Sequence, residues 1–272
     1  MKKIPYLIIL LALALITTSC GHTETVPITE REHTLLVSDE ELLEYSTQEY
    51  RDFLKQTELS DDEANTAMVK RVGKRLADAV EKYMRENGRE DEIEYYDWEF
   101  CLTQDEEVNA FCMPGGKIVV FEGILPVTQD EESLAVVLGH EVAHAVAKHS
   151  AEQISEQMRQ EYGVNALSLI LGPLLDDNVN TAFNAIASTG LSLFSLKYDR
   201  AHELEADHMG LIFTAMAGYD PQCAIPFWER MEEESPFAIE FLSDHPDCKN
   251  RIKAIRKHMP QAMEYYNKAA NN

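Results

Sequence analysis

Apolar side chains recur at every third and fourth position over long stretches of this chain, the spacing of one face of an α-helix. In the clearest stretch the apolar positions are Ala64, Met68, Val72, Leu76, Ala79, Val80 and Tyr83. We interpret the preceding Ser60-Asp61-Asp62-Glu63 as a capping box, and the pattern stops near Asn87-Gly88, a typical helix end. Ser38, followed by three acidic residues, indicates the cap and first turn of an earlier helix.

The rest of the chain predicts further helices around a small sheet. Helical spacing covers residues 131–149, 199–217, 221–234 and 249–266. Residues 93–102 and 117–121 are rich in aromatic and β-branched residues and predict strands, with a turn at Pro114-Gly115-Gly116. Two apolar stretches, 164–175 and 181–196, are shorter than the roughly 20 residues of a membrane span and predict buried or lid helices. We expect one mostly helical α+β domain over residues 36–272.

The N-terminus has the pattern of a targeting segment. Lys2 and Lys3 precede an apolar run over residues 4–16, and small residues lead to Cys20. This predicts a signal peptide over residues 1–19. Cys20 resembles the acylated cysteine of bacterial lipoproteins, and residues 20–35 predict that lipidated cysteine with a flexible tether. We therefore expect a protein of the bacterial cell envelope that contacts its membrane only through a lipid anchor and faces the periplasm. Plain secretion is the alternative.

The net charge of the chain limits its possible binding partners. The chain has 24 Lys and Arg against 48 Asp and Glu, a formal net charge of −24, which predicts no nucleic-acid partner.

Lipidation of Cys20 leaves Cys101, Cys112, Cys223 and Cys248, an even number in an oxidising compartment. Four cysteines allow three pairings, and the sequence does not choose among them. One of them, Cys223–Cys248, would join the C-terminal helices, and buried free thiols are the alternative.

The strongest chemical signal is His140-Glu141-Val142-Ala143-His144, an H-E-x-x-H motif inside an apolar run. Residues four apart in a helix share one face, so both imidazoles can bind one metal ion. Glu141 then lies beside the metal, where it can take a proton from water. The motif predicts a zinc-dependent peptidase with one Zn2+ per chain.

A catalytic zinc site usually has a third protein ligand and one open position. Glu203 is the best candidate, and Asp207 follows four residues later on the same helical face. Asp207 can accept a hydrogen bond from the outer ring nitrogen of a ligand histidine. Glu205 is expected on another face, towards solvent or a cap, and His202 is a weaker alternative ligand.

Three motifs in order resemble the HtpX/BepA/LoiP family of zinc metallopeptidases, peptidase family 48. They are residues 109–116 (Asn-Ala-Phe-Cys-Met-Pro-Gly-Gly), the H-E-x-x-H helix and residues 203–207 (Glu-Leu-Glu-Ala-Asp). The resemblance implies a gluzincin-like fold with a small antiparallel or mixed sheet over the active-site helix, and Glu203 as the third ligand. It also implies that Asn109, Ala110 and Phe111 belong to an edge strand that holds extended peptides by main-chain pairing.

A later segment, Ser243-Asp244-His245-Pro246 followed by Arg251-Ile252, also resembles a family element. His245 would then approach the metal, as an oxyanion donor or as a cap on the resting zinc. Arg200 and Tyr198 are alternative oxyanion donors. The expected function is a zinc endopeptidase that hydrolyses unfolded or misassembled cell-envelope proteins. The alternative is an envelope chaperone with a closed zinc site, and the oligomeric state is left open.

Overall fold

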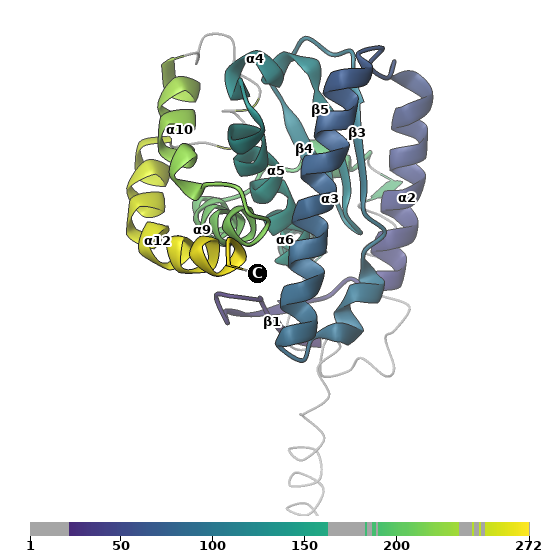
Figure 1. Cartoon of the computed structure of the whole chain (residues 1–272). Helices are drawn as coiled ribbons and strands as arrows, with labels where there is room; N and C mark the ends of the chain where they lie inside the picture. Colours follow the sequence, from purple (N-terminus) through teal and green to yellow (C-terminus); the bar gives the residue numbers. More distant parts are fainter. Residues whose placement is uncertain are drawn as a thin grey trace, which may run out of the picture.

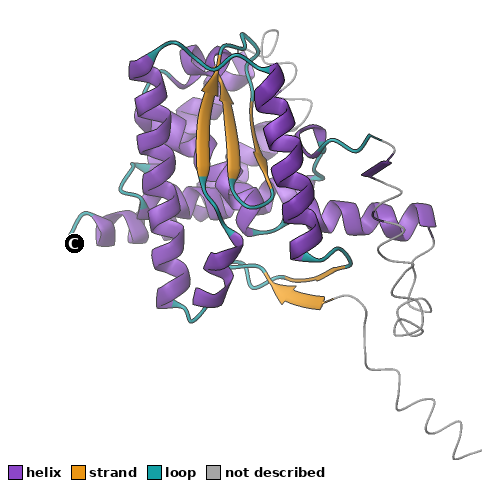
Figure 2. Cartoon of the chain, turned by 90° about the vertical axis from the view of Figure 1, so that its right-hand side faces the viewer, coloured by secondary structure: helices purple, strands orange, loops and turns teal. Residues whose placement is uncertain are grey.

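The structure, a computed structural model, describes residues 22–162, 183, 187–188, 190–233, 241, 245 and 248–271. Helices surround a small sheet (Figure 1), and the side view shows helices flanking its strands (Figure 2). The mostly helical α+β fold predicted from the sequence is confirmed. Within the described residues, we find no helix with the length and apolar character needed to cross a bilayer.

The sheet is mixed and buried on both faces. Its strands are β3 (Glu99–Thr103), β4 (Ala110–Met113) and β5 (Lys117–Phe121), in the order β3-β5-β4. β5 pairs in parallel with β3 and antiparallel with β4, so β4 lies at an edge of this sheet. Because successive side chains of a strand point to opposite faces, Ile118 and Val120 enter one core and Val119 and Phe121 enter the other.

Different helices cover the two faces of the sheet. The first core contains apolar residues of α3 (Glu63–Glu86) and α5 (Glu131–Val146), together with those of the C-terminal helices. The second core contains residues of α2 (Asp39–Gln56) and α6 (His149–Tyr162). α5 is buried from Ser133 to Val146, which explains why its sequence is apolar on all sides.

Two glycines let α5 pack closely against α9 (Arg200–Met216). A Cβ atom on Gly139 would lie 2.8 Å from the carbonyl oxygen of Gly210, so the two backbones nearly touch there. Asp130 and Asp199 cap the two helices by accepting hydrogen bonds from backbone N–H groups of the first turn. This close packing places the H-E-x-x-H segment of α5 against the segment of α9 that carries Glu203.

The remaining elements complete the domain. They are β1 (His22–Thr25), β2 (Glu32–Leu35), η1 (Glu90–Tyr95), η2 (Glu122–Ile124), α4 (Leu125–Thr128), η4 (Leu193–Ser195), η5 (Pro221–Cys223), α10 (Ala224–Glu233) and α12 (Cys248–Ala269). α12 packs against α9 and α10, on the side of α5 away from α2 (Figure 1).

The N-terminal segment differs from the expected tether. Residues 22–35, predicted to be flexible, form an antiparallel hairpin of β1 and β2. Val26 and Leu35 are buried, and Arg31 pairs with Glu152 of α6, so ion pairs and a few apolar anchors fix this polar segment. Composition alone did not reveal partners that lie more than 100 residues away.

Several boundaries also differ. Residues 90–95, partly included in the first predicted strand, form a 3₁₀-helix, and β3 begins at Glu99. α3 is capped by Asp62 rather than Ser60, whose hydroxyl instead contacts Glu122. The predicted helix over residues 131–149 breaks at Lys148, which has φ +52°.

The other sequence-based expectations concern cysteines and apolar stretches. In the part of the chain that is described, Cys101, Cys112 and Cys223 are free thiols, so Cys223 is not paired with Cys248. The stretch 164–175 and six residues of 181–196 lie outside the described residues, and residues 190–196 contain the short 3₁₀-helix η4 rather than the predicted helix.

Candidate metal centre

Four buried side chains from separate parts of the chain converge on one point. Their ligand atoms lie within 4.8 Å of one another, and the residues are His140, His144, Glu203 and His245. Nε2 of His140 lies 3.0 Å from Nε2 of His144, since the two residues are one turn apart on α5. α9 brings Oε1 of Glu203 to 3.3 Å from Nε2 of His144. His245 completes the group, with Nδ1 3.0 Å from the same carboxylate oxygen.

The donor set fits a zinc ion. Imidazole nitrogens and a carboxylate oxygen are common zinc ligands. Within the described part of the chain, Oε1 of Glu141 and Oε2 of Glu203 are buried and accept no hydrogen bond, although Nη1 of Arg251 lies 3.1 Å from Oε2 of Glu203 in an ion pair. Lone pairs of both carboxylates therefore remain for a cation or a water molecule. Burial lowers the pKa of His140, but the carboxylates of Glu203 and Asp207 outweigh it and raise that pKa to about 9. The two carboxylates therefore favour positive charge at His140.

Two of the groups have the ionisation state that a metal ligand needs. Burial holds the pKa of His144 well below its ordinary value, so this imidazole is neutral. Burial alone would raise the pKa of Glu203, but electrostatic interactions with His245 and Arg251 hold it well below its ordinary value. Glu203 is therefore an ionised carboxylate inside the protein.

Glu141 has the properties of a proton acceptor. It is buried beside the four donors, and Oε1 lies 3.6 Å from Nε2 of His245. Burial raises the pKa of Glu141 above its ordinary value. A carboxylate whose pKa moves towards neutrality accepts a proton more readily at physiological pH.

Asp207 lies behind His140, as the sequence predicted for an outer partner. Its Oδ1 is 3.1 Å from Nδ1 of His140, on the side of the ring away from His144. Arg251 donates to both oxygens of Asp207 from Nη2 and Nε, at 2.7 and 2.8 Å. The guanidinium of Arg251 also lies 3.7 Å above the ring of Trp228. Sequence reasoning gave Arg251 no role, although its position six residues after His245 in the same motif was the available signal.

Other candidate residues have different roles from those expected. Glu205, expected towards solvent or a cap, has a side chain only 8% exposed and pairs with His149 and Arg31. His202, the weaker ligand candidate, turns away from the cluster, and its Nε2 lies 3.3 Å from Glu152. Buried polar partners from distant segments account for both differences.

The alternative oxyanion donors also lie outside the cluster of ligand atoms. The ring of Tyr198 stacks on His144 with centroids 4.1 Å apart, and its hydroxyl is 2.8 Å from that of Ser150. Arg200 lines a cavity of about 570 Å³ together with Glu203, Arg251, Lys253 and Lys257. The residues that line this cavity belong to α9 and α12.

The last residues predicted from the sequence are those of the substrate strand and the lipidation site. Ala110 and Phe111 belong to edge strand β4, and Asn109 precedes it. β4 packs beside α5, the helix that carries His140 and His144. Cys20 lies outside the described residues, and its lipidation stays a prediction.

Comparison with known proteins gives a family and several relatives. The family "Peptidase family M48" matches residues 64–259. The "Mitochondrial metalloendopeptidase OMA1" of Schizosaccharomyces pombe is 39% identical over 168 residues, which are 61% of this chain and 48% of that protein. The human "Metalloendopeptidase OMA1, mitochondrial" is 30% identical over 253 residues, 89% of this chain and 47% of that protein. The "Beta-barrel assembly-enhancing protease" of Yersinia pestis is 27% identical over 179 residues, 61% of this chain and 37% of that protein. The chain thus spans less than half the length of these three relatives.

These relatives correct the expected location. The sequence predicted a lipoprotein of the bacterial cell envelope that faces the periplasm. The relatives with 39% and 30% identity named above are mitochondrial proteins, whereas the bacterial one is less similar. The predicted location is therefore wrong, because a signal-like N-terminus and a single cysteine say less about location than similarity over most of the chain does.

Proposed function

We propose that this chain, which belongs to peptidase family M48, a family of zinc metallopeptidases, is a zinc-dependent endopeptidase that cuts unfolded or extended polypeptides. One observation carries the proposal. His140, His144 and Glu203 gather around one point, and the buried carboxylate of Glu141 lies beside them. Three protein ligands with an adjacent carboxylate are the arrangement of a catalytic zinc site rather than a structural one.

In this proposal each residue has a defined role. His140, His144 and Glu203 hold the zinc, and Asp207 orients His140. The chemistry that zinc supplies when bound is a lowered pKa for a water molecule and polarisation of the substrate carbonyl. Glu141 accepts a proton from the attacking water and returns it to the amine of the leaving peptide. The burial that raises the pKa of Glu141 suits both transfers.

The substrate class follows from the strand beside the metal centre. β4 is an edge strand of the sheet and packs against α5, so a peptide paired along it would run past the metal ligands. Main-chain pairing needs an extended segment, which unfolded or misassembled proteins offer and folded ones do not. The name of the Yersinia pestis relative, a protease that enhances β-barrel assembly, also suits a role in protein quality control.

The test is the substitution Glu141→Gln, with Glu132→Gln on the same helix as the matched control. Glu141→Gln should keep one zinc per chain while casein hydrolysis falls by about 10²-fold or more. Glu132→Gln should keep both. Wild-type turnover by Glu141→Gln, or a protein that binds no zinc, would remove the basis of the proposal.

A second candidate function rests on His245. Its Nδ1 lies 3.0 Å from Glu203 Oε1 and 3.2 Å from Nε2 of His140, so it is placed to become a fourth ligand. A site closed by four protein ligands is structural, and the protein would then hold unfolded chains without cutting them. In that case casein hydrolysis is absent with or without a chelator.

His245→Ala separates the roles of this side chain. A resting-state cap predicts faster hydrolysis with zinc retained. An oxyanion donor predicts a lower kcat, by about 10²-fold, with zinc and KM retained. A structural ligand predicts loss of zinc itself.

A further inference from the structure

A chain of buried polar contacts leads away from His144, on the side opposite to the metal cluster. Nε2 of His144 faces His140 and Glu203, whereas Nδ1 lies 2.9 Å from Nδ1 of His149. Nε2 of His149 lies 3.1 Å from Oε2 of Glu205. Both histidines are almost fully buried, so their ring nitrogens depend on these contacts for hydrogen bonds.

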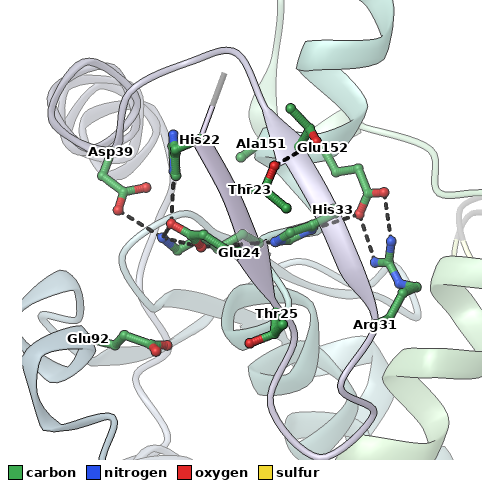
Figure 3. Close-up of polar contacts among 12 residues, drawn as sticks. His22, Thr23, Glu24, Thr25, Arg31, His33, Asp39, Glu92, Ala151 and Glu152 are labelled. Atoms are coloured by element: carbon green, nitrogen blue, oxygen red, sulfur yellow. Dashed lines mark hydrogen bonds and ion pairs between the residues drawn. The ribbon is translucent and has the colours of Figure 1, made fainter. Parts of the chain in front are cut away.

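The chain of contacts ends at the N-terminal hairpin. Thr29 donates to Oε1 of Glu205 at 2.5 Å, and Nε of Arg31 donates to Oε2 at 2.8 Å. Arg31 also forms two parallel hydrogen bonds of 2.8 Å with Glu152 (Figure 3). Thr29 and Arg31 come from the loop between β1 and β2, more than 170 residues from Glu205 in sequence.

The loop that presents these two residues is strained. Ile28 has φ +68° and Glu30 has φ +55°, and neither residue is glycine. Each such residue costs roughly 1–2 kcal/mol, more for a β-branched side chain, and persists only where the surroundings impose it. The two left-handed residues flank Thr29 and precede Arg31, so the strain is located where the loop meets Glu205.

The contacts dictate which nitrogens carry hydrogen. An ionised carboxylate such as that of Glu205 only accepts hydrogen bonds, so Nε2 of His149 must donate. Nδ1 of His149 is then an acceptor, and Nδ1 of His144 must donate to it. That leaves the lone pair of His144 on Nε2, the nitrogen that faces the metal cluster.

We propose that the N-terminal hairpin is part of the metal site: Thr29 and Arg31 fix Glu205, and through His149 they set the tautomer and orientation of His144 for zinc binding. The inference rests on the proposed function. His140 has a related arrangement, because Oδ1 of Asp207 lies 3.1 Å from its Nδ1 and Arg251 donates to Asp207. A carboxylate thus stands behind each of these two histidines, directly behind His140 and through His149 behind His144, and an arginine contacts each carboxylate. Arg31, Thr29, Glu205 and His149 are positioning residues.

The hairpin offers a matched control for the test. Arg89 also fastens it, by donating to the backbone oxygen of Thr25, and its guanidinium otherwise pairs with Glu92 rather than with Glu205. Arg31→Met removes the contacts of the hairpin with Glu205 and Glu152, and Arg89→Met removes its contact with the guanidinium of Arg89. Only Arg31→Met interrupts the contacts that lead to His144.

Zinc affinity is the main readout, measured by competition with a chromophoric chelator on the full chain. Arg31→Met should weaken zinc binding by about 10-fold or more, Arg31→Lys should restore part of it, and Arg89→Met should stay within about 2-fold of wild type. Wild-type affinity in Arg31→Met, or an equal loss in Arg89→Met, would overturn the inference. Should Arg31→Met fail to fold, Thr29→Val allows the same comparison at one of the hydrogen bonds.

A spectroscopic readout separates this role from a purely structural one. In ¹⁵N-histidine NMR of the zinc-loaded protein, His149 should carry hydrogen on Nε2 in the wild type and show a mixture of tautomers in Arg31→Met. An unchanged His149 tautomer with lower thermal stability would indicate that Arg31 only supports the fold. Because neither measurement uses proteolysis, the inference can fail while the endopeptidase activity stands, and the reverse also holds.

Discussion

The close contact of α5 and α9 makes Gly210→Ala a demanding test of how the metal centre is built. A Cβ atom on Gly210 would lie 2.8 Å from three backbone atoms, the carbonyl carbon and oxygen of Gly139 and the nitrogen of His140. None of them is the flexible end of a side chain. The new methyl group therefore fits only if the two helices move apart.

The size of that movement follows from the contact distance. Ordinary contacts between such atoms begin near 3.5 Å, so the helices must separate by about 0.7 Å. Overpacking of this kind costs about 1–3 kcal/mol of stability. Zinc sites tolerate only about 0.2 Å in ligand distance, and α5 carries two ligands while α9 carries the third. Zinc affinity should therefore fall by about 10-fold or more, and proteolysis by about 10²-fold.

Gly88→Ala is the control. Gly88 has φ +69°, and a Cβ atom added there would meet no described atom within 4 Å, so alanine adds strain of about 1–2 kcal/mol without a clash. Thermal unfolding and zinc competition should show that both variants lose stability and only Gly210→Ala loses zinc affinity. Wild-type zinc affinity in Gly210→Ala would refute the idea that this helix contact sets the ligand geometry.

Three more predictions address charge and metal. Burial alone would raise the pKa of Glu152, but hydrogen bonds from two histidines and Arg31 outweigh it and hold that pKa well below its ordinary value. The ionised carboxylate of Glu152 therefore stabilises the fold at pH values above the pKa of this group in the unfolded chain, and the stabilisation is lost on acidification. In urea unfolding, the difference in free energy of unfolding between wild type and Glu152→Gln should shrink between about pH 6 and about pH 3. Arg251→Met leaves Asp207 and Glu203 without their buried partner and should cost about 3–5 kcal/mol in the same assay, whereas a cost below about 1 kcal/mol would contradict this reading. In a solution whose free zinc concentration is about 100 times the Kd for zinc, removal of the metal with EDTA should cost about 2.7 kcal/mol of stability and lower Tm by about 5–10 °C. An unchanged Tm would mean that zinc does not bind the native state selectively.

Local signals in the sequence were sufficient for most of the long helices, although not for α6, and for two metal ligands. His140 and His144 are one helical turn apart in an apolar run, so their common face follows from helix geometry alone. Asp207 follows Glu203 by one turn, and the structure places its carboxylate against His140 as that spacing suggested. Ser38 caps α2 through its own side chain, another contact within a few residues.

Most of the failures share one cause, which is dependence on distant partners. Residues 22–35 contain nothing that marks them as ordered, since Arg31 is fixed by Glu152 and Glu205. Glu205 was expected near solvent or a cap because helical spacing gives the direction of a side chain but not what covers it. The first predicted strand began too early because a buried aromatic residue such as Tyr95 suits the end of a 3₁₀-helix as well as a strand.

The sequence by itself determined the chemistry of this protein: a helix with two imidazoles and a carboxylate, a second helix with the third ligand, and the family to which both belong. Only the tertiary structure decided how those groups are held. The opposed glycines, the pairing of Arg251 with Asp207 and the contacts from the hairpin to His144 all join residues that are far apart along the chain. Hydrogen bonding and close packing depend on distances in space, and a linear pattern carries those distances only within one element of secondary structure.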